Sequence, residues 1–295
     1  MGKHLNQSGS GAFVTQTKNR LKENIVSTHT SKTKITTAKI KSMKGKGRIV
    51  SLTAHTKTIA QLMDPYVDLI VVGDSLGMVA YGFDSTLPVT IEMMISHGSA
   101  VVRGAETSCV IVDMPFGSYQ ESKQLAYKNA AEVMAQTGAQ GIKIEGGSEM
   151  LETVEFLIKR GIPVMPHIGL CPQYANVLGG FKVQGKTQHQ RDYLTETARK
   201  FEKVGAFSLL VEGVDELTAR EITRSVSIPT IGIGASPECD GQVLVTEDML
   251  GLFTKYTPKF VKKYIDLSQL IKTSFSEYEQ EVRNGAFPTR EHCFD

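Results

Sequence analysis

Short apolar runs alternate with longer amphipathic stretches along the chain from about residue 47 onward. Short apolar runs suit buried strands and amphipathic stretches suit surface helices, so the alternation predicts repeated βα units. The predicted strands span residues 48–53, 68–72, 109–113, 141–145, 163–168, 208–212 and 230–233, with an eighth near 242–245. The predicted helices span residues 91–103, 122–136, 149–160, 191–204 and 214–225.

The predicted strands are apolar along nearly their whole length, as in parallel sheets that are covered on both faces. An open, doubly wound sheet would normally carry a glycine-rich dinucleotide loop after its first strand, and residues 53–56 (TAHT) contain no glycine. We therefore predict a closed (β/α)8 TIM barrel. It is expected to form a single domain over residues 34–295, with one or two C-terminal helices within 262–284.

A glycine marks the end of four predicted helices, at Gly104, Gly138, Gly161 and Gly205. Glycine suits the left-handed residue that ends many helices. We therefore expect left-handed backbone at these four positions.

Charge is unevenly distributed, although the net charge is only +2. Residues 1–48 contain eleven Lys or Arg and one acid, Glu23, whereas the remainder contains 22 basic and 30 acidic residues. We expect residues 1–33 to form a disordered basic arm, and their Ser, Thr and basic content also fits a mitochondrial transit peptide. Nucleic-acid binding is not expected, because the basic residues are not interleaved with aromatic residues and the body is acidic.

The four cysteines are scattered, without the paired spacing of a zinc site or of a small disulfide framework. This usage indicates reduced thiols and a cytoplasmic location, with the mitochondrion as the alternative. No apolar run approaches the roughly 18 residues of a membrane span, so we expect no membrane partner.

Charged or polar residues stand at the ends of five predicted strands. They are Asp74, Asp113, Lys143 with Glu145, His167, and Glu212. A buried charge is costly unless it is paired, hydrogen-bonded or bound to a metal. In a parallel barrel these strand ends meet on the face that carries the active site. The sequence therefore predicts one polar site at that face.

Period-two alternation in residues 141–145 (GIKIE) places Lys143 and Glu145 on one face of the strand and the two isoleucines on the other. If the isoleucines pack under the helices, Lys143 and Glu145 point into the barrel mouth. The alternative is an internal ion pair that only fills the barrel.

Asp74 and Asp113 each follow a strand, where an Asp often serves as a helix N-cap. Together with Glu145 they fit a magnesium site better, because Mg²⁺ prefers oxygen ligands, uses one or two carboxylates and keeps water or substrate oxygens. Zinc is disfavoured, since the chain offers one candidate His here and no grouped Cys.

His167 and Glu212 have two interpretations each. His167 is either a hydrogen-bonded core residue or part of the polar rim. Glu212 lies in an apolar setting that raises the pKa of a carboxyl group, which suits a general base near neutral pH. The alternative for Glu212 is a buried acid bonded to backbone amides.

Two glycine-containing segments fall in predicted loops. The connection from about residue 169 to 190 is long for a compact fold, which is typical of a lid or binding loop, and it contains the glycine-rich stretch 179–185. Residues 232–235 (GIGA) are similar to a barrel phosphate loop, although close backbone approach explains these glycines equally well.

Seven stretches, taken in order, resemble the ketopantoate hydroxymethyltransferase (3-methyl-2-oxobutanoate hydroxymethyltransferase) family. They are 72–78 (VGDSLGM), 84–90 (DSTLPVT), 113–119 (DMPFGSY), 143–147 (KIEGG), 167–170 (HIGL), 180–185 (GFKVQG) and 231–235 (IGIGA). The likeness runs from about residue 34 to 294 and leaves only the basic arm uncovered.

The resemblance implies a barrel of the phosphoenolpyruvate/pyruvate type and a magnesium-dependent reaction. A hydroxymethyl group passes from 5,10-methylenetetrahydrofolate to 3-methyl-2-oxobutanoate, giving 2-dehydropantoate on the route to pantothenate and coenzyme A. The resemblance also implies a homo-oligomer, a decamer, whose partners are the α-keto acid and the folate.

The same resemblance implies residue roles. The metal positions are Asp74, Asp113 and Glu145. The keto-acid positions are Asp74, Ser75, Asp113 and Lys143. Glu212 is implied as the base that forms the enolate on the metal, Lys143 is expected to stabilise it, and His167 to orient the carboxylate or the new hydroxyl.

The chain also departs from the family pattern. His55 and Thr56 replace Tyr and Asp, Pro166 replaces Gly, Cys171 replaces Thr, and Ser236 replaces Gly. Two alternatives therefore stay open: a carbon–carbon lyase or mutase of the same superfamily acting on another α-keto acid, and a catalytically silent barrel. A lyase or mutase usually carries a Lys-Arg-Cys-Gly-His loop, and this sequence has none.

Overall fold

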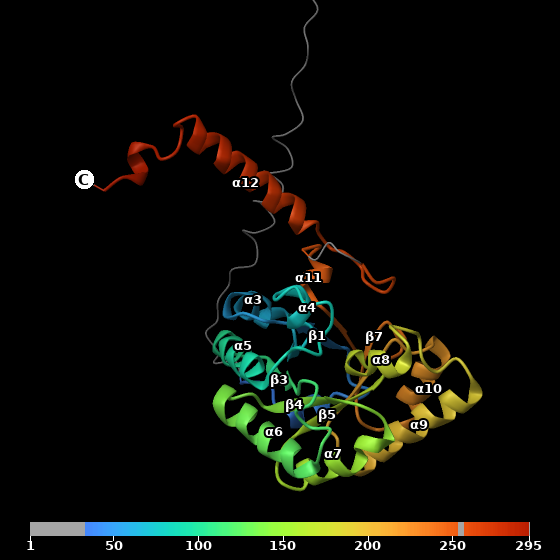
Figure 1. Ribbon diagram of the computed structural model, residues 1–295. Coiled ribbons are helices and arrows are strands. Elements are labelled where there is room, and N and C mark those ends of the chain that lie inside the picture. The colour runs from blue at the N-terminus through green and yellow to red at the C-terminus, as the bar shows by residue number, and fades with distance from the viewer. Residues whose placement is uncertain (1–32, 253–256, 295) are drawn as a thin grey trace, which may run out of the picture. The chain divides into compact units, whose positions relative to one another are not determined.

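The computed structural model describes residues 33–252 and 257–294, of which Lys34 onward belong to one compact unit. It contains eight strands: β1 Ile49–Thr53, β2 Leu69–Val72, β3 Cys109–Asp113, β4 Gly141–Glu145, β5 Val164–Gly169, β6 Leu209–Glu212, β7 Thr230–Ile233 and β8 Gly241–Leu244. They are parallel and close in sequence order, with β8 pairing with β1. Figure 1 shows helices arranged around these strands. The predicted (β/α)8 barrel is confirmed, and the open sheet is excluded.

Within the described chain, six helices cover the barrel, and five of them lie where the amphipathic stretches predicted them. They are α3 Lys57–Met63, α5 Ile91–Gly104, α6 Lys123–Thr137, α7 Leu151–Ile158, α9 Gln188–Lys203 and α10 Glu216–Ser225. Side-chain oxygens fix several starts: Thr90, Ser122 and Thr187 each accept a hydrogen bond from the backbone N–H three residues on. Of these helices, α3 was not predicted.

The remaining elements complete the described chain. They are α2 Thr37–Lys41, η1 Asp64–Tyr66, α4 Leu76–Val79, η2 Ser148–Met150, η3 Pro172–Tyr174, α8 Ala175–Leu178, α11 Thr246–Met249, α12 Leu267–Arg283 and η4 Arg290–His292. The predicted C-terminal helix is confirmed as the single helix α12. Within the described residues, no helix is long and apolar enough to cross a membrane. Apart from Thr33, the predicted basic arm lies outside the described residues and stays a prediction.

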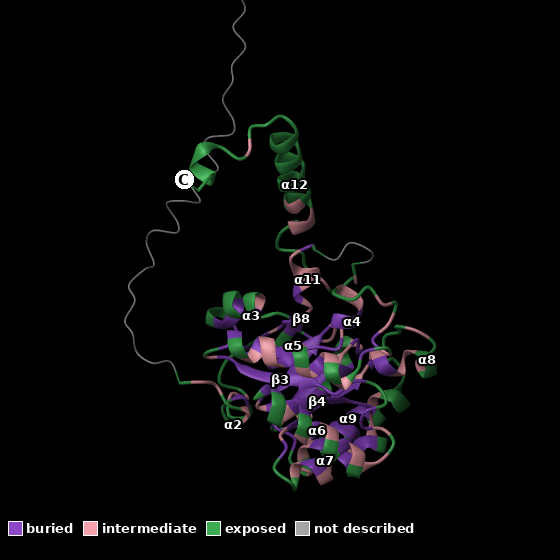
Figure 2. Cartoon of the chain, turned by 60° about the vertical axis from the view of Figure 1, so that its left-hand side comes forward, coloured by how far each residue is buried: buried purple, intermediate pink, exposed green. Residues whose placement is uncertain are grey.

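Alternation along the strands produces two apolar layers. One lies inside the barrel and includes Ile49, Val71 and Ile111, whereas the other lies between the strands and the helices and includes Ile142 and Val164. Figure 2 shows the strands as the buried centre of the barrel, with helices whose buried residues face them. Polar residues on the inner face near the carboxyl ends therefore point into the mouth of the barrel.

Three of the four helix-ending glycines have the predicted left-handed backbone. Gly138, Gly161 and Gly205 have φ angles of 74°, 86° and 103°. The prediction is wrong for Gly104, which is the last residue of α5. A Cβ there would lie 2.4 Å from the Lys57 carbonyl oxygen, so close approach of α3 requires this glycine.

The long connection after β5 is not an unstructured loop. It contains η3 and α8, and Gln184 forms an isolated bridge with Val214 that fastens it to the segment after β6. This arrangement holds the connection beside the carboxyl ends of β5 and β6.

Candidate functional site

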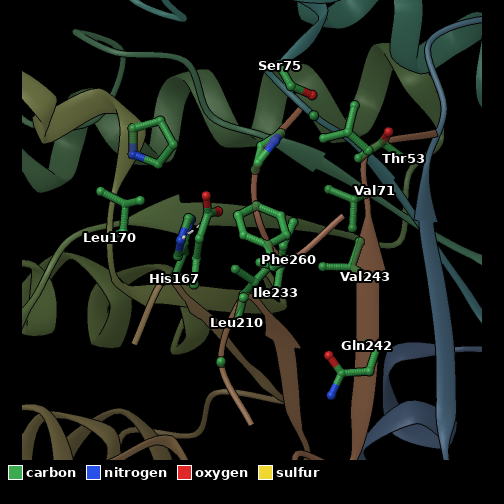
Figure 3. A pocket seen from close by; sticks show the side chains of 18 of the residues that line it. Thr53, Val71, Ser75, His167, Leu170, Leu210, Ile233, Gln242, Val243 and Phe260 are labelled. Carbon is green, nitrogen blue, oxygen red and sulfur yellow. Dashed lines mark ion pairs between the residues drawn. The ribbon is translucent and has the colours of Figure 1, made fainter. Parts of the chain in front are cut away.

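A cavity of about 1150 Å³ reaches the carboxyl ends of the strands. Every predicted site residue lines it: Asp74, Ser75, Asp113, Lys143, Glu145, His167 and Glu212. Figure 3 shows His167 and Leu170 on one side of this space and Val71 and Val243 on the other. The strand-end residues therefore converge as predicted.

Lys143 is the centre of the polar cluster. Its side chain lies on the inner face of β4, because Ile142 and Ile144 belong to the outer apolar layer. The Lys143 Nζ atom lies 3.1 Å from Asp113 Oδ2 and 3.4 Å from Glu145 Oε1. Both acids are almost fully buried, so one ammonium group is shared between two desolvated carboxylates. All three of these residues also line the cavity.

Asp74 joins this cluster through the backbone and through a side chain from the β5 connection. Its N–H donates to Asp113 Oδ2 at 3.1 Å, and its Oδ2 accepts from Gln173 Nε2 at 2.9 Å. The N-cap interpretation does not hold for either acid, because Ser75 occupies the cap position of α4 and Ser122 that of α6.

The three carboxylates carry more negative charge than Lys143 can neutralise. Burial, the Glu145 charge and the Asp113 charge together raise the pKa of Asp74 well above its usual value. Burial also raises the pKa of Asp113. For Glu145 burial opposes ionisation, but the charge of Lys143 outweighs it and lowers the pKa to about 2. The site is therefore short of positive charge near Asp74 and Asp113.

His167 is neutral and lies between the acid cluster and Glu212. Burial and the nearby Lys143 ammonium lower its pKa. Its Nδ1 lies 3.2 Å from Lys143 Nζ, and its Nε2 lies 3.4 Å from Glu212 Oε2. Because a Lys ammonium can only donate, Nδ1 accepts and the ring proton is placed on Nε2, which has no hydrogen-bond partner among the described residues.

Glu212 ends β6 at the edge of the cavity, where its side chain is 18% exposed. Burial and the charge of Glu145 raise the pKa of its carboxyl group to about 8. Within the described part of the chain, no backbone amide donates a hydrogen bond to this carboxylate. The alternative interpretation of Glu212, a buried acid bonded to backbone amides, therefore does not hold. A carboxyl group of this kind can take up and release a proton near neutral pH.

Two polar residues of the site were missed by sequence reasoning. Gln173, in η3, is 4% exposed and contacts both Asp74 and Glu145. Tyr119 is fully buried, and its hydroxyl contacts Gln173 Oε1 at 2.7 Å and accepts from Glu145 N at 3.2 Å. No pattern along the chain marks either residue, because their partners are distant in sequence.

His55 and Thr56, which depart from the family pattern, lie where β1 leads into α3. Thr56 caps α3 by accepting from Ile59 N. His55 is buried, and its Nδ1 lies 3.1 Å from Glu247 Oε1 of α11. These two residues fasten the chain after β1 and do not line the cavity.

The other departures leave the polar cluster in place. Pro166 lies within β5 and is followed by His167, which still faces the cavity. The Cys171 thiol donates to the His167 carbonyl oxygen at 3.4 Å. Ser236 lines the cavity and donates to Glu216 Oε1 at 3.0 Å.

The residues present fit a divalent cation that is only partly held by protein. Asp113 Oδ1 is buried without a hydrogen-bond partner, and the Lys143 ammonium lies against the other oxygen, Oδ2. Among the described residues, no group of three or more His, Cys, Asp or Glu is placed so that it could hold a metal ion by itself. Mg²⁺ needs no such set, since one or two carboxylates with water and substrate oxygens complete its octahedron.

The chain is similar to proteins of one family over nearly all of the described residues. The model of the family described as Ketopantoate hydroxymethyltransferase matches residues 34–290. The 3-methyl-2-oxobutanoate hydroxymethyltransferase 1 of Hahella chejuensis is 65% identical over 269 residues, which cover 91% of this chain and 97% of that protein. The enzyme of the same name from Burkholderia lata is 53% identical, with 91% and 94% covered.

Solved structures with the same fold are much more distant in sequence. A 2,3-dimethylmalate lyase of the PEP mutase/isocitrate lyase superfamily matches with a TM-score of 0.55 at 12% identity, covering 88% of this chain and 92% of that one. A phosphonopyruvate hydrolase matches with the same TM-score and identity, with 87% and 92% covered. These likenesses confirm the barrel type and do not concern the reaction.

Proposed function

Because the chain belongs to the ketopantoate hydroxymethyltransferase family and is a 3-methyl-2-oxobutanoate hydroxymethyltransferase of pantothenate biosynthesis, we propose roles for its cavity residues in that reaction. The reaction joins the one-carbon unit of 5,10-methylenetetrahydrofolate to C3 of 3-methyl-2-oxobutanoate. The observation that carries the proposal is the position of Glu212, a desolvated carboxyl group separated by His167 from a cluster in which one ammonium, that of Lys143, balances three carboxylates.

Asp74, Asp113 and Glu145 are the proposed magnesium residues. Asp113 Oδ1 has no hydrogen-bond partner, and Asp74 lies close to the negative charges of Glu145 and Asp113. Both observations support direct contacts of Asp74 and Asp113 with the ion. Both oxygens of Glu145 already have partners, Lys143 for Oε1 and the Gln173 N–H for Oε2, which favours a contact through water. When bound, Mg²⁺ supplies Lewis-acid polarisation of the keto and carboxylate oxygens.

The keto acid is proposed to bind at Asp74, Ser75, Asp113 and Lys143. The two acids act through the ion, since carboxylates alone would repel an anionic substrate. Ser75 Oγ is buried without a hydrogen-bond partner, so it can donate to a substrate oxygen. Lys143 supplies the positive charge that favours the anionic transition state.

Glu212 is the proposed base that takes the C3 proton. Its carboxyl group reaches the cavity, and its raised pKa gives it enough basicity to accept a proton from carbon. His167 Nε2 lies 3.4 Å from Glu212 Oε2 without a hydrogen-bond partner, and His167 is proposed to orient the substrate carboxylate or the new hydroxyl of the product. The new C–C bond then forms between C3 and the methylene carbon of the folate. The bonds from that carbon to N5 and N10 break and water supplies the hydroxyl oxygen, so that 2-dehydropantoate and tetrahydrofolate are released.

The folate is proposed to enter over the apolar part of the cavity. Leu170, Phe181, Val183 and Phe260 line it, and they come from the β5 connection and from the segment before α12. A flat heterocycle is suited to such a wall, with few polar groups fixing its orientation.

Wild-type protein is expected to exchange the C3 proton of 3-methyl-2-oxobutanoate in heavy water only when magnesium is present. The reason is that the acidity of C3 depends on polarisation of the neighbouring carbonyl. Proton NMR follows the loss of the C3 signal with and without chelator, and folate is left out so that no product forms. Equal exchange rates in both samples would refute the proposed use of the acids, and no exchange in either would favour a silent barrel.

A homo-oligomer, a decamer by family resemblance, is the proposed assembly. Among the described residues, those of α12 are all at least partly exposed, although the helix carries a stripe of large apolar side chains. They are Leu270, Phe275, Tyr278 and Val282. On β1, Val50 is 46% exposed, and β8, which pairs with β1, is followed by the four-residue α11. A second copy of the chain would cover such apolar surface.

Light scattering during size-exclusion chromatography measures this assembly. The proposal predicts a mass near ten times the chain mass of 32.3 kDa. Replacing Phe275 and Tyr278 with Ser is expected to reduce that mass, because both side chains belong to the exposed stripe. A monomeric wild type would contradict the proposal. We also propose a cytoplasmic location, which the free thiols of Cys109, Cys171, Cys239 and Cys293 support.

A further inference from the structure

Gln173 is the only amide side chain among the described residues that contacts one of the proposed magnesium acids. It lies in η3, at the start of the long β5 connection, and is 4% exposed. Its Nε2 donates to Asp74 Oδ2 at 2.9 Å, and its backbone N–H donates to Glu145 Oε2 at 2.9 Å. One residue therefore holds two of the three acids, and it comes from a different segment than either of them.

Backbone groups fix which way the Gln173 amide points. The Met114 carbonyl oxygen lies 2.9 Å from the same Nε2, and a carbonyl can only accept. The atom beside Asp74 must therefore be the amide nitrogen. On the other side, Oε1 accepts from the Tyr119 hydroxyl at 2.7 Å and from Gln120 Nε2 at 3.1 Å. All four hydrogen-bonding positions of the amide are used.

The orientation of Gln120 is fixed in the same way. Its Oε1 accepts from the Gly117 N–H at 2.8 Å, so its Nε2 must be the donor toward Gln173. The carboxylate of Asp74 is thus held by a chain of oriented groups that begins at the backbone. Its Oδ2 is occupied by Gln173, which leaves the other oxygen, Oδ1, to face a ligand.

We propose that Gln173 is a positioning residue, which orients Asp74 for the divalent cation and fastens the β5 connection beside the acid cluster. It touches neither the reacting atoms nor the ion, and it acts through Asp74. Outer partners of metal ligands typically change metal affinity or activity by about 10- to 100-fold. The proposal rests on the proposed magnesium role of Asp74.

The test compares Mn²⁺ binding to wild type, Gln173→Met and Gln173→Glu by electron paramagnetic resonance, which counts the free ion and needs no turnover. Methionine keeps the approximate volume and removes both donors, whereas glutamate places a carboxylate against Asp74 Oδ2 and the Met114 carbonyl. Mn²⁺ affinity is expected to fall by about 10- to 100-fold in both variants. Magnesium-dependent C3 exchange should then need more metal, with a smaller change in its rate at saturating metal.

Gln140 supplies the matched control. It also bridges two segments through its amide, accepting from Val110 N at 3.0 Å and donating to the Ile35 carbonyl at 2.7 Å, but it does not line the cavity. Gln140→Met should lower the unfolding temperature without changing Mn²⁺ affinity. Unfolding is followed for every variant, and binding is measured where each one is folded.

The possible outcomes distinguish the positioning role of Gln173 from the proposed metal site on which it depends. No Mn²⁺ binding by wild type would contradict the proposed metal site itself. Binding by wild type with unchanged affinity in Gln173→Met would overturn the positioning role and leave the metal site standing. If Gln173→Met does not fold, Tyr119→Phe gives the answer, because it removes one of the two donors that hold Oε1. A smaller loss of Mn²⁺ affinity in that variant supports the role, and unchanged affinity overturns it.

Discussion

Glu212→Gln is expected to lower the rate of magnesium-dependent C3 proton exchange by about 100- to 10,000-fold, the usual contribution of a general base. The amide has nearly the same shape but cannot accept a proton at the carbon acid. Affinity for Mg²⁺ and for the keto acid should change little, because Glu212 is not among the residues proposed to bind them. Exchange is measured by NMR in heavy water, and metal affinity by titration with Mn²⁺.

The control for this variant is Glu221→Gln on α10, an exposed acid outside the cavity, which should exchange the proton at the wild-type rate. The pH dependence gives a second check. Burial raises the pKa of Glu212 to about 8, so its basic form increases as pH rises toward that value. The rate of wild-type exchange should therefore rise with pH. The midpoint of this rise should lie above the usual pKa of Glu but below 8, because the positive charge of the bound cation lowers the pKa of Glu212. A flat profile between about pH 5 and 8 would assign proton removal to another group.

Lys143→Met is expected to destabilise the metal-free protein by about 3–5 kcal/mol, the usual cost of removing one partner from a buried ion pair. The variant leaves Asp113 and Glu145 desolvated without their ammonium partner. Added Mg²⁺ should restore part of the lost stability, because the ion supplies the missing charge at the same acids. Urea unfolding with chelator and with saturating magnesium gives the free energy of unfolding in each state.

An exposed lysine provides the comparison. Lys159 pairs with Glu155 one helical turn away on α7, and its side chain is 66% exposed. Lys159→Met should change the free energy of unfolding by less than about 1 kcal/mol and show no dependence on magnesium. If the two lysine variants lost equal stability, or if magnesium rescued neither, the shared-ammonium account of Lys143 would be wrong.

The barrel and the inner face of β4 could be predicted because both follow from local rules. Alternation within five residues is enough to separate Lys143 and Glu145 from the isoleucines beside them. The parallel order of the strands then brings Asp74 and Asp113 to the same end of the barrel. For these residues, the position along the strand also determines the direction in which the side chain points.

Other features depend on contacts that local sequence does not encode. Gln173 and Asp74 are 99 residues apart, and their hydrogen bond depends on the path of the β5 connection. Gly104 was assigned to a helix cap, whereas its real constraint is the Lys57 carbonyl of a neighbouring helix. The protonation of His167 also depends on which charges surround it in space. Tertiary packing, rather than propensity, decides each of these cases.

The most direct test of the magnesium site is a crystal structure with Mn²⁺ and 3-methyl-2-oxobutanoate, in which anomalous scattering locates the metal. We predict one strong peak in the cavity, bound by Asp74, Asp113 and the keto and carboxylate oxygens of the substrate, with Glu145 close by and Glu212 facing C3. A peak elsewhere in the protein, or a keto acid bound beside these acids without metal, would contradict the central claim.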